Sequence, residues 1–145
     1  MRKAVRAIII RDNKLLVMKR NKFGKEYFTL VGGGVDFDES NEQALVREIA
    51  EETGLTLKKA RLVFTEEAGL PYGTQYVFLC EDPGGEVALH AESEEAKISS
   101  MGENIYDPMW LDLDQLPKSE FRSEALKQAI LAGVKDGFPD DIVEL

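Results

Sequence analysis

The alternation of hydrophobic and polar positions at the start of the chain predicts a β-hairpin. Ala4–Arg11 and Lys14–Lys19 are apolar, strand-like segments, and the Asp12-Asn13 pair between them favours a tight turn. The aromatic and β-branched segment Glu26–Val31 predicts a third strand. It leads directly into three glycines at positions 32–34, so we expect this strand to feed a glycine loop.

A helical pattern begins after the glycines. Ser40 followed by Gln43 forms a candidate capping box, and Gly54 is the kind of residue that ends a helix. The spacing of the apolar residues predicts a helix over Glu39–Thr53. Its core-facing stripe is expected to contain Leu45, Val46, Ile49 and Ala50.

The rest of the chain alternates irregularly between strand-like and helical segments. We expect a loop over Ala91–Asp107 and a helix over Glu120–Val134 with Ser119 as its N-cap. This irregular order favours an α/β fold with a mixed sheet, and no repeat or linker divides residues 1–145, so we expect one domain. The remaining strands are expected at Leu62–Thr65, Thr74–Cys80, Glu86–His90 and Met109–Leu111.

Composition narrows the classes of function. With 18 Lys and Arg against 27 Asp and Glu, the formal charge is −9, which disfavours binding to a nucleic acid polymer. Cys80 and His90 are the single cysteine and the single histidine, which excludes an internal disulfide framework and a zinc site of several Cys and His. No segment approaches the roughly 18 consecutive apolar residues of a membrane span. We therefore expect a cytoplasmic protein that does not bind membranes.

Three glutamates share one face of the predicted helix. At about 100° per residue, Glu48, Glu51 and Glu52 fall within an arc of roughly 100°. Like charges so close to a helix C-terminus repel one another and oppose the macrodipole, so a bound cation would relieve them. Oxygen ligands suit Mg²⁺ or Mn²⁺. The alternative is a solvated acidic helix surface.

The glutamates also belong to a longer pattern. Gly33-x5-Glu39-x7-Arg47-Glu48-Ile49-x-Glu51-Glu52-x-Gly54-Leu55 resembles the Nudix box of the Nudix hydrolase family at every fixed position. The chain departs from many members at Val31, where they have proline, and at Asp38, where they have glycine. These two departures affect the shape of the loop and remove no proposed ligand.

The resemblance implies a fold, a reaction and roles for the box residues. Family members are single α/β/α sandwich domains with a mixed sheet, are often homodimers, and hydrolyse a pyrophosphate bond in a nucleoside diphosphate linked to another moiety. The implied substrate is a small nucleotide-type molecule and the implied cofactor is Mg²⁺ or Mn²⁺. The implied metal ligands are Glu48, Glu51, Glu52 and the Gly32 carbonyl. Glu39, Arg47 and Gly33 would support the site.

The resemblance leaves the general base open. In MutT-type members the glutamate that matches Glu48 is the usual candidate. In ADP-ribose pyrophosphatases the role can fall to a glutamate on a later loop, where Glu95 is our choice. The same segment also contains Glu92, Glu94 and Glu103, and an exposed loop acid is the alternative reading of each.

Candidate substrate-binding residues lie outside the box. Arg20 and Lys22 belong to a dense basic cluster that could bind a phosphate, although a solvated hairpin end is equally consistent with it. Tyr72 is a candidate base-binding residue. In the family, the position of Pro71 marks ADP-ribose hydrolases and that of Tyr72 marks dinucleoside polyphosphate hydrolases, so the two markers together do not choose a substrate.

Two other readings remain. A Nudix-fold module without catalysis could sense a nucleotide or bind a protein, although such modules typically lose box glutamates and this chain keeps them all. A purely structural acidic domain would gain no stability from Mg²⁺, whereas a true metal site is stabilised when metal binds the native state.

Overall fold

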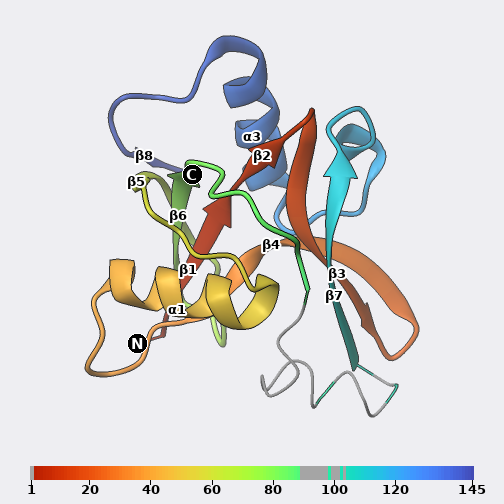
Figure 1. Ribbon diagram of the computed structural model, residues 1–145, viewed down its shortest axis with the longest axis horizontal. Coiled ribbons are helices and arrows are strands. Elements are labelled where there is room, and N and C mark those ends of the chain that lie inside the picture. The colour runs from red at the N-terminus through yellow and green to blue at the C-terminus, as the bar shows by residue number, and fades with distance from the viewer. Residues whose placement is uncertain (1, 89–97, 99–101, 103) are drawn as a thin grey trace.

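The computed structural model describes residues 2–88, 98, 102 and 104–145, and most of this part of the chain builds one sheet and the helices that cover it (Figure 1). The helices are α1 (Asn41–Thr53), the short 3₁₀ helix η1 (Leu116–Lys118) and α3 (Glu124–Asp136). The strands are β1 (Lys3–Ile8), β2 (Ile10–Arg11), β3 (Lys14–Lys22), β4 (Lys25–Gly34), β5 (Ala60–Glu67), β6 (Thr74–Cys80), β7 (Asn104–Asp112) and β8 (Val143–Glu144).

The sheet is mixed, as the sequence predicts. Its order is β2-β3-β4-β1-β6-β5-β8, with β7 paired to β3. The β1–β6 and β5–β8 pairs are parallel and the other pairs are antiparallel. Strand β4 changes partner along its length, because Leu30 and the residues before it pair with β3 whereas Val31–Gly34 pair with β1. This change of partner places the three glycines in the middle of the fold.

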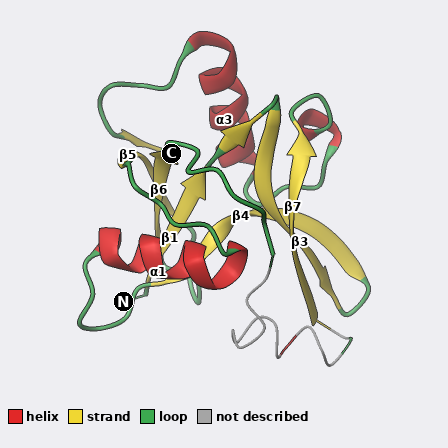
Figure 2. Ribbon diagram, in the orientation of Figure 1, coloured by secondary structure: helices red, strands yellow, loops and turns green. Residues whose placement is uncertain are grey.

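One helix covers each face of the sheet (Figures 1 and 2). Successive side chains of a strand point to opposite faces, so Val5 and Ala7 of β1 enter one hydrophobic cluster and Ile8 enters the other. Helix α1 contributes Ala44, Leu45 and Ile49 to the first cluster, and α3 contributes Leu126 and Ile130 to the second. The α/β/α sandwich is therefore confirmed.

The glycines do not form the loop that the sequence predicts. Gly32, Gly33 and Gly34 continue strand β4, because each is aligned with a residue of β1 in the pairing that runs from Arg6 to Ala4. Long-range strand pairing thus overrides the low strand propensity of glycine. The first predicted strand is also interrupted: it divides into β1 and β2 at Ile9, while the turn at Asp12-Asn13 and its hairpin are confirmed.

The predicted first helix is right in its caps and wrong in its start. The capping box of Ser40 and Gln43 is formed, and Gly54 ends the helix in the left-handed conformation, with φ of 78°. The helix begins at Asn41 because Ser40 is its N-cap and has an extended backbone, with φ of −77° and ψ of 164°. Val46 is exposed and is not part of the core stripe.

The C-terminal predictions need three corrections. The last helix begins at Glu124 with Ser123 as its N-cap, because the preceding residues pair in extended form with Phe28. Strand β7 extends over Asn104–Asp112 and aligns with the whole of β3, so it includes residues expected in a loop. Residues 86–88 of the expected strand Glu86–His90 form no strand, and His90 lies outside the described residues.

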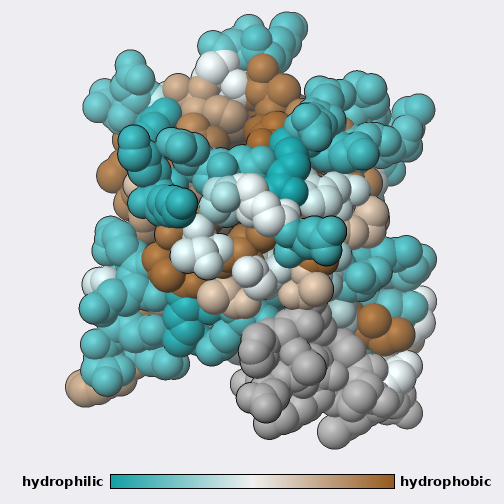
Figure 3. Space-filling view, in the orientation of Figure 1, coloured by the Kyte–Doolittle hydropathy of each residue, from teal (hydrophilic) through white to brown (hydrophobic). Residues whose placement is uncertain are grey.

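Within the described ranges, no helix has both the length and the apolar character needed to span a membrane. On the face shown in Figure 3, hydrophilic residues predominate and hydrophobic ones lie in separate patches.

Candidate functional site

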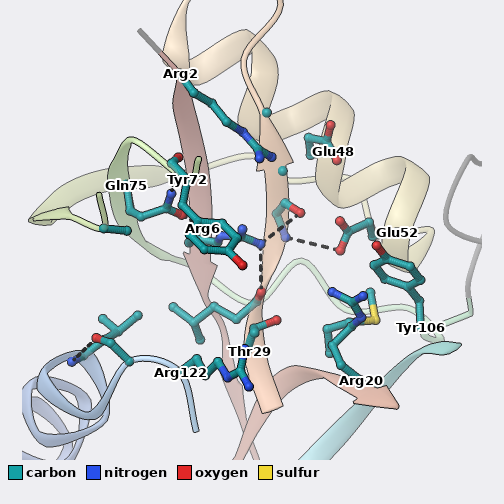
Figure 4. Close-up of a pocket in the computed structure, with 18 of the residues that line it drawn as sticks. Arg2, Arg6, Arg20, Thr29, Glu48, Glu52, Tyr72, Gln75, Tyr106 and Arg122 are labelled. Carbon is teal, nitrogen blue, oxygen red and sulfur yellow. Dashed lines mark hydrogen bonds between the residues drawn. The ribbon is translucent and has the colours of Figure 1, made fainter. Parts of the chain in front are cut away.

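A large pocket lies beside the stretch of β4 that passes from β3 to β1. Its volume is about 1350 Å³, and its lining includes the three glycines and the three glutamates predicted from the sequence. Figure 4 shows that Glu48 and Glu52 project from α1 toward the pocket, whereas Arg6, Arg20 and Arg122 enter from other elements. The pocket therefore has an acidic side and a basic side.

The acidic side is packed against the glycines. Glu48 and Glu52 retain only 7% and 4% of their exposure, and the Gly32 N–H donates a hydrogen bond to Glu52 Oε2 at 3.3 Å. A Cβ at position 33 would overlap the Glu48 carboxylate, so a side chain there would displace Glu48 from its present place. The third glutamate, Glu51, also lines the pocket and is half-buried.

Arg47 is the centre of the polar network at the start of α1. Its guanidinium donates to both oxygens of Glu39, at 2.7 and 2.8 Å, and to the Gly34 carbonyl at 3.0 Å. It also donates to Glu48 Oε1 at 2.9 Å and to Glu51 Oε2 at 3.4 Å. One planar guanidinium thus connects the end of β4 to two glutamates of the acidic side, which is the supporting position expected of Arg47 and Glu39.

Glu39 is held in its charged form by this network. The hydrogen bonds from Arg47, together with one from the Asp36 N–H at 2.8 Å, lower the pKa of Glu39 from 4.5 to about 2. The same contacts raise the pKa of Arg47 above its ordinary value. Because the pKa of the folded state is depressed, the stabilisation is complete above the unfolded pKa and is lost as the pH falls toward 2.

We therefore expect Glu39→Gln to lower the free energy of unfolding most at neutral pH. The difference from the wild type should shrink between pH 4.5 and 2, as Glu39 of the wild type becomes protonated. Urea unfolding at a series of pH values measures it, and Glu42→Gln, an exposed carboxylate in the first turn of α1, serves as the control. A difference that stays constant down to pH 2 would contradict the assigned role.

Arg6 lies on the floor of the pocket and connects it to the loop between β5 and β6. Its Nη1 donates to the Leu30 and Gly32 carbonyls at 3.3 and 3.2 Å, and its Nε donates to Gln75 Oε1 at 3.1 Å. Gln75 in turn donates to the Tyr72 carbonyl at 3.1 Å. Burial lowers the pKa of Arg6, and the carboxylate of Glu52 opposes this effect. The Gly32 carbonyl, a predicted metal ligand, retains a second lone pair beside Arg6.

The predicted substrate-binding residues reach the same pocket. Arg20 and Lys22 from β3 line it, and so does Tyr72, whose side chain is 51% exposed. Guanidinium groups already stand over the ring of the neighbouring pocket residue Tyr27. Trp110 packs against the core, with the Arg11 guanidinium 4.5 Å from its ring centre. Burial raises the pKa of the Cys80 thiol to about 12, which agrees with a structural role.

Sequence reasoning missed several pocket residues. Arg6 could have been found, since it is a charge within an otherwise apolar strand segment. Arg122 and Gln75 carry no local signal, and they reach the pocket only through the tertiary fold.

The alternative candidates for the general base, Glu92, Glu94, Glu95 and Glu103, lie outside the described residues.

The donor set fits a hard divalent cation. Among the described residues, no three His, Cys, Asp or Glu side chains are gathered into a ready metal site. However, Mg²⁺ keeps several waters and needs only one or two carboxylates together with substrate phosphates. Glu48 and Glu52 are buried like charges one turn apart with Glu51 beside them, and all of these ligands are oxygen. They match the chemistry of Mg²⁺ or Mn²⁺ rather than that of a softer metal.

Comparisons with known proteins show what this chain is similar to. The family model described as NUDIX domain matches residues 1–130. An ADP-ribose pyrophosphatase of Methanocaldococcus jannaschii is 38% identical over 128 residues, which are 85% of this chain and 69% of that protein. An NAD-capped RNA hydrolase of Pectobacterium carotovorum is 29% identical over 76% of the chain, but the match spans only 38% of that relative.

Solved structures show the same architecture. A MutT Nudix hydrolase from Burkholderia pseudomallei superimposes with a TM-score of 0.65 at 27% identity, covering 87% of this chain and 94% of that one. An ADP-ribose pyrophosphatase from Streptococcus suis gives a TM-score of 0.68 at 21% identity, covering 99% and 98%, which supports the fold alone.

Proposed function

Because the chain belongs to the Nudix hydrolase family, we propose that it is a metal-dependent hydrolase of a pyrophosphate bond in a nucleoside diphosphate linked to another moiety. The observation that carries the proposal is the acidic side of the pocket, where Glu48 and Glu52 lie against the glycines of β4 and Glu51 lines the same pocket. The moiety could be a further phosphate, a sugar or a second nucleoside. ADP-ribose is the first substrate to test, because the archaeal relative is named an ADP-ribose pyrophosphatase.

The glutamates would hold Mg²⁺ or Mn²⁺ together with the Gly32 carbonyl. When bound, such ions neutralise charge on a pyrophosphate and polarise its phosphorus. Arg47 keeps Glu48 and Glu51 in place, and the Gly32 N–H keeps Glu52 in place, so the carboxylates are oriented before a substrate arrives. This pre-organisation reduces the ordering that the reaction would otherwise require.

The rest of the pocket would bind the substrate. Arg20 and Lys22 supply positive charge for phosphate, and Tyr72 offers a half-exposed ring to a base or a sugar.

The net reaction adds one water across one P–O–P link and releases two products that each carry phosphate. Two carboxylates are candidates for the base that accepts the proton of this water: Glu48 of the box, and Glu95 of the later segment.

The proposal is tested by analysing products from a mixed panel in water enriched in ¹⁸O. The panel contains ADP-ribose, nucleoside triphosphates, sugar nucleotides and dinucleoside polyphosphates, each with Mg²⁺, with Mn²⁺ and with a chelator. We expect cleavage only with metal, with one solvent oxygen in one of the two phosphate products by mass spectrometry. If a nucleotide binds in calorimetry but none is cleaved, the nucleotide-sensing reading replaces this proposal.

The proposed function also carries expectations about the compartment, the oligomeric state and the ligand class. The single cysteine is buried, in keeping with a protein of a reducing compartment such as the cytoplasm. We also propose a homodimer as the form to look for by light scattering, as in many family members. We also expect a small nucleotide as the ligand rather than a nucleic acid polymer, because a chain with a net charge of −9 repels a long polyanion.

A further inference from the structure

An alternating stack of tyrosines and arginines forms the basic side of the pocket. The guanidinium of Arg20 lies 3.6 Å from the ring centre of Tyr106 and 5.6 Å from that of Tyr27. The guanidinium of Arg122 lies 3.8 Å from the ring centre of Tyr27. Strand register produces this order, because Arg20 is aligned with Tyr106 on one neighbouring strand and with Tyr27 on the other.

The Arg122 end of the stack is fixed by backbone contacts. The Phe28 N–H donates to the Glu120 carbonyl at 2.8 Å, and the Arg122 N–H donates to the Phe28 carbonyl at 2.9 Å. These bonds hold the segment before α3 against β4, next to Tyr27. Both arginines are thus presented by a paired backbone rather than by a free loop.

Each stacked guanidinium keeps donors at its edge that no described residue engages. A guanidinium that lies over a ring points its N–H donors sideways, in the geometry that binds a phosphate with two hydrogen bonds. Arg20 uses Nη2 on Asn104 Oδ1 at 2.6 Å, and its Nε is buried without a hydrogen-bond partner. Arg122 makes no side-chain hydrogen bond to any residue in the described ranges, and neither arginine has a carboxylate within 4.0 Å there.

We propose that Arg20 and Arg122 form a second anion subsite, which binds a terminal phosphate carried by the substrate in addition to the pyrophosphate link that is cleaved. Two guanidinium charges match the nearly dianionic charge of such a terminal phosphate at neutral pH. The phosphates inside a pyrophosphate link are less charged and would lie at the acidic side, with its metal. Figure 4 places Glu48 and Arg122 at opposite ends of the pocket, with Arg6 between them. The assignment of this phosphate to a substrate rests on the proposed function, whereas phosphate binding itself does not.

Two neighbouring features set the strength of the subsite. Helix α3 begins two residues after Arg122, at Glu124, so the positive end of its dipole lies at the same wall. The carboxylate of Glu66 opposes an anion there, because the hydroxyl of Ser123, the residue after Arg122, donates to Glu66 Oε2 at 2.6 Å and holds it at this wall. Replacing Glu66 by Gln keeps an acceptor for Ser123 and removes the charge, so it should strengthen phosphate binding.

Phosphate binding is tested without metal or turnover. Inorganic phosphate is titrated into ¹⁵N-labelled, metal-free protein at constant ionic strength, and the dissociation constant is read from amide shifts. We expect saturable shifts around residues 20, 27 and 122, a dissociation constant about tenfold higher in Arg122→Gln, and a lower one in Glu66→Gln. Lys25→Gln, on an exposed residue of the same strand as Tyr27, is the matched control. Equal affinities in wild type and Arg122→Gln would overturn the proposal.

The substrate assignment is tested with two nucleotides that share adenosine. ATP carries a terminal phosphate and ADP-ribose carries none, and each is measured as a substrate or, if it is not cleaved, as a competitive inhibitor. We expect Arg122→Gln to raise KM or Ki about tenfold for ATP, to leave kcat nearly unchanged, and to change ADP-ribose less than twofold. Equal losses for both nucleotides would mean that the arginines bind the pyrophosphate itself and would overturn the assignment. Absence of turnover would count against the proposed function alone, because both binding measurements remain.

Discussion

We expect Glu52→Gln to lower kcat about 10³-fold, since an ion held by this carboxylate supplies several kcal/mol of transition-state stabilisation. Glu52 is nearly fully buried and accepts a hydrogen bond from the Gly32 N–H, so it has a fixed place in the site. Glutamine is almost the same size and keeps an oxygen that can accept this bond. The change therefore removes a charge and a metal ligand while leaving the packing in place. Initial rates on the preferred nucleotide at saturating metal measure the effect.

The matched control for Glu52→Gln lies on the same helix. Glu42→Gln removes a carboxylate from the exposed first turn of α1, away from the pocket, and should keep kcat within about twofold. Adding Mg²⁺ should raise the melting temperature less in Glu52→Gln than in the wild type or in Glu42→Gln, because metal stabilises the folded state that binds it. If Glu52→Gln retained more than a tenth of the wild-type kcat, this carboxylate would not be a metal ligand in the reaction.

The acidic side of the pocket could be predicted because its information is local in sequence. Helical spacing alone places Glu48, Glu51 and Glu52 on one face, and the capping box and Gly54 are contained within the helix ends. The strand order was less accessible. The sequence shows three glycines, but only their pairing with β1 makes them a strand instead of a loop, because this pairing joins segments far apart in the chain.

The basic side could not be predicted for the same reason. Tyr106, Arg20 and Tyr27 come together through the register of three strands, and Arg122 joins them from a segment that runs alongside β4. No short sequence motif indicates this arrangement. Sequence reasoning found Arg20 only as part of a local basic cluster, and it gave no sign that guanidinium groups stand over the ring of Tyr27.

Gly32→Ala is expected to destabilise the fold by about 2–6 kcal/mol, adding about 1–3 kcal/mol of backbone strain to a similar cost of overpacking. Gly32 has a φ of 142°, which residues with a side chain rarely adopt, and a Cβ there would overlap the Val5 carbonyl oxygen on β1. Because both overlapping groups belong to paired strands, neither can move without opening the β1–β4 ladder. Native domains have only about 5–15 kcal/mol of stability in total, so much of the protein could unfold. Urea unfolding followed by circular dichroism measures the loss.

Gly34→Ala is the control that separates this close approach from a general intolerance of side chains in β4. At position 34 the φ angle is not positive, and the nearest atom to a Cβ would be Arg2 Nη2 at 3.9 Å, an ordinary contact. We therefore expect Gly34→Ala to stay within about 1 kcal/mol of the wild type, as surface changes generally do. Similar losses in both variants would show that the strand as a whole excludes side chains. Little loss in either would show that β1 and β4 can separate at Gly32, and that the backbone against Glu52 is softer than this structure indicates.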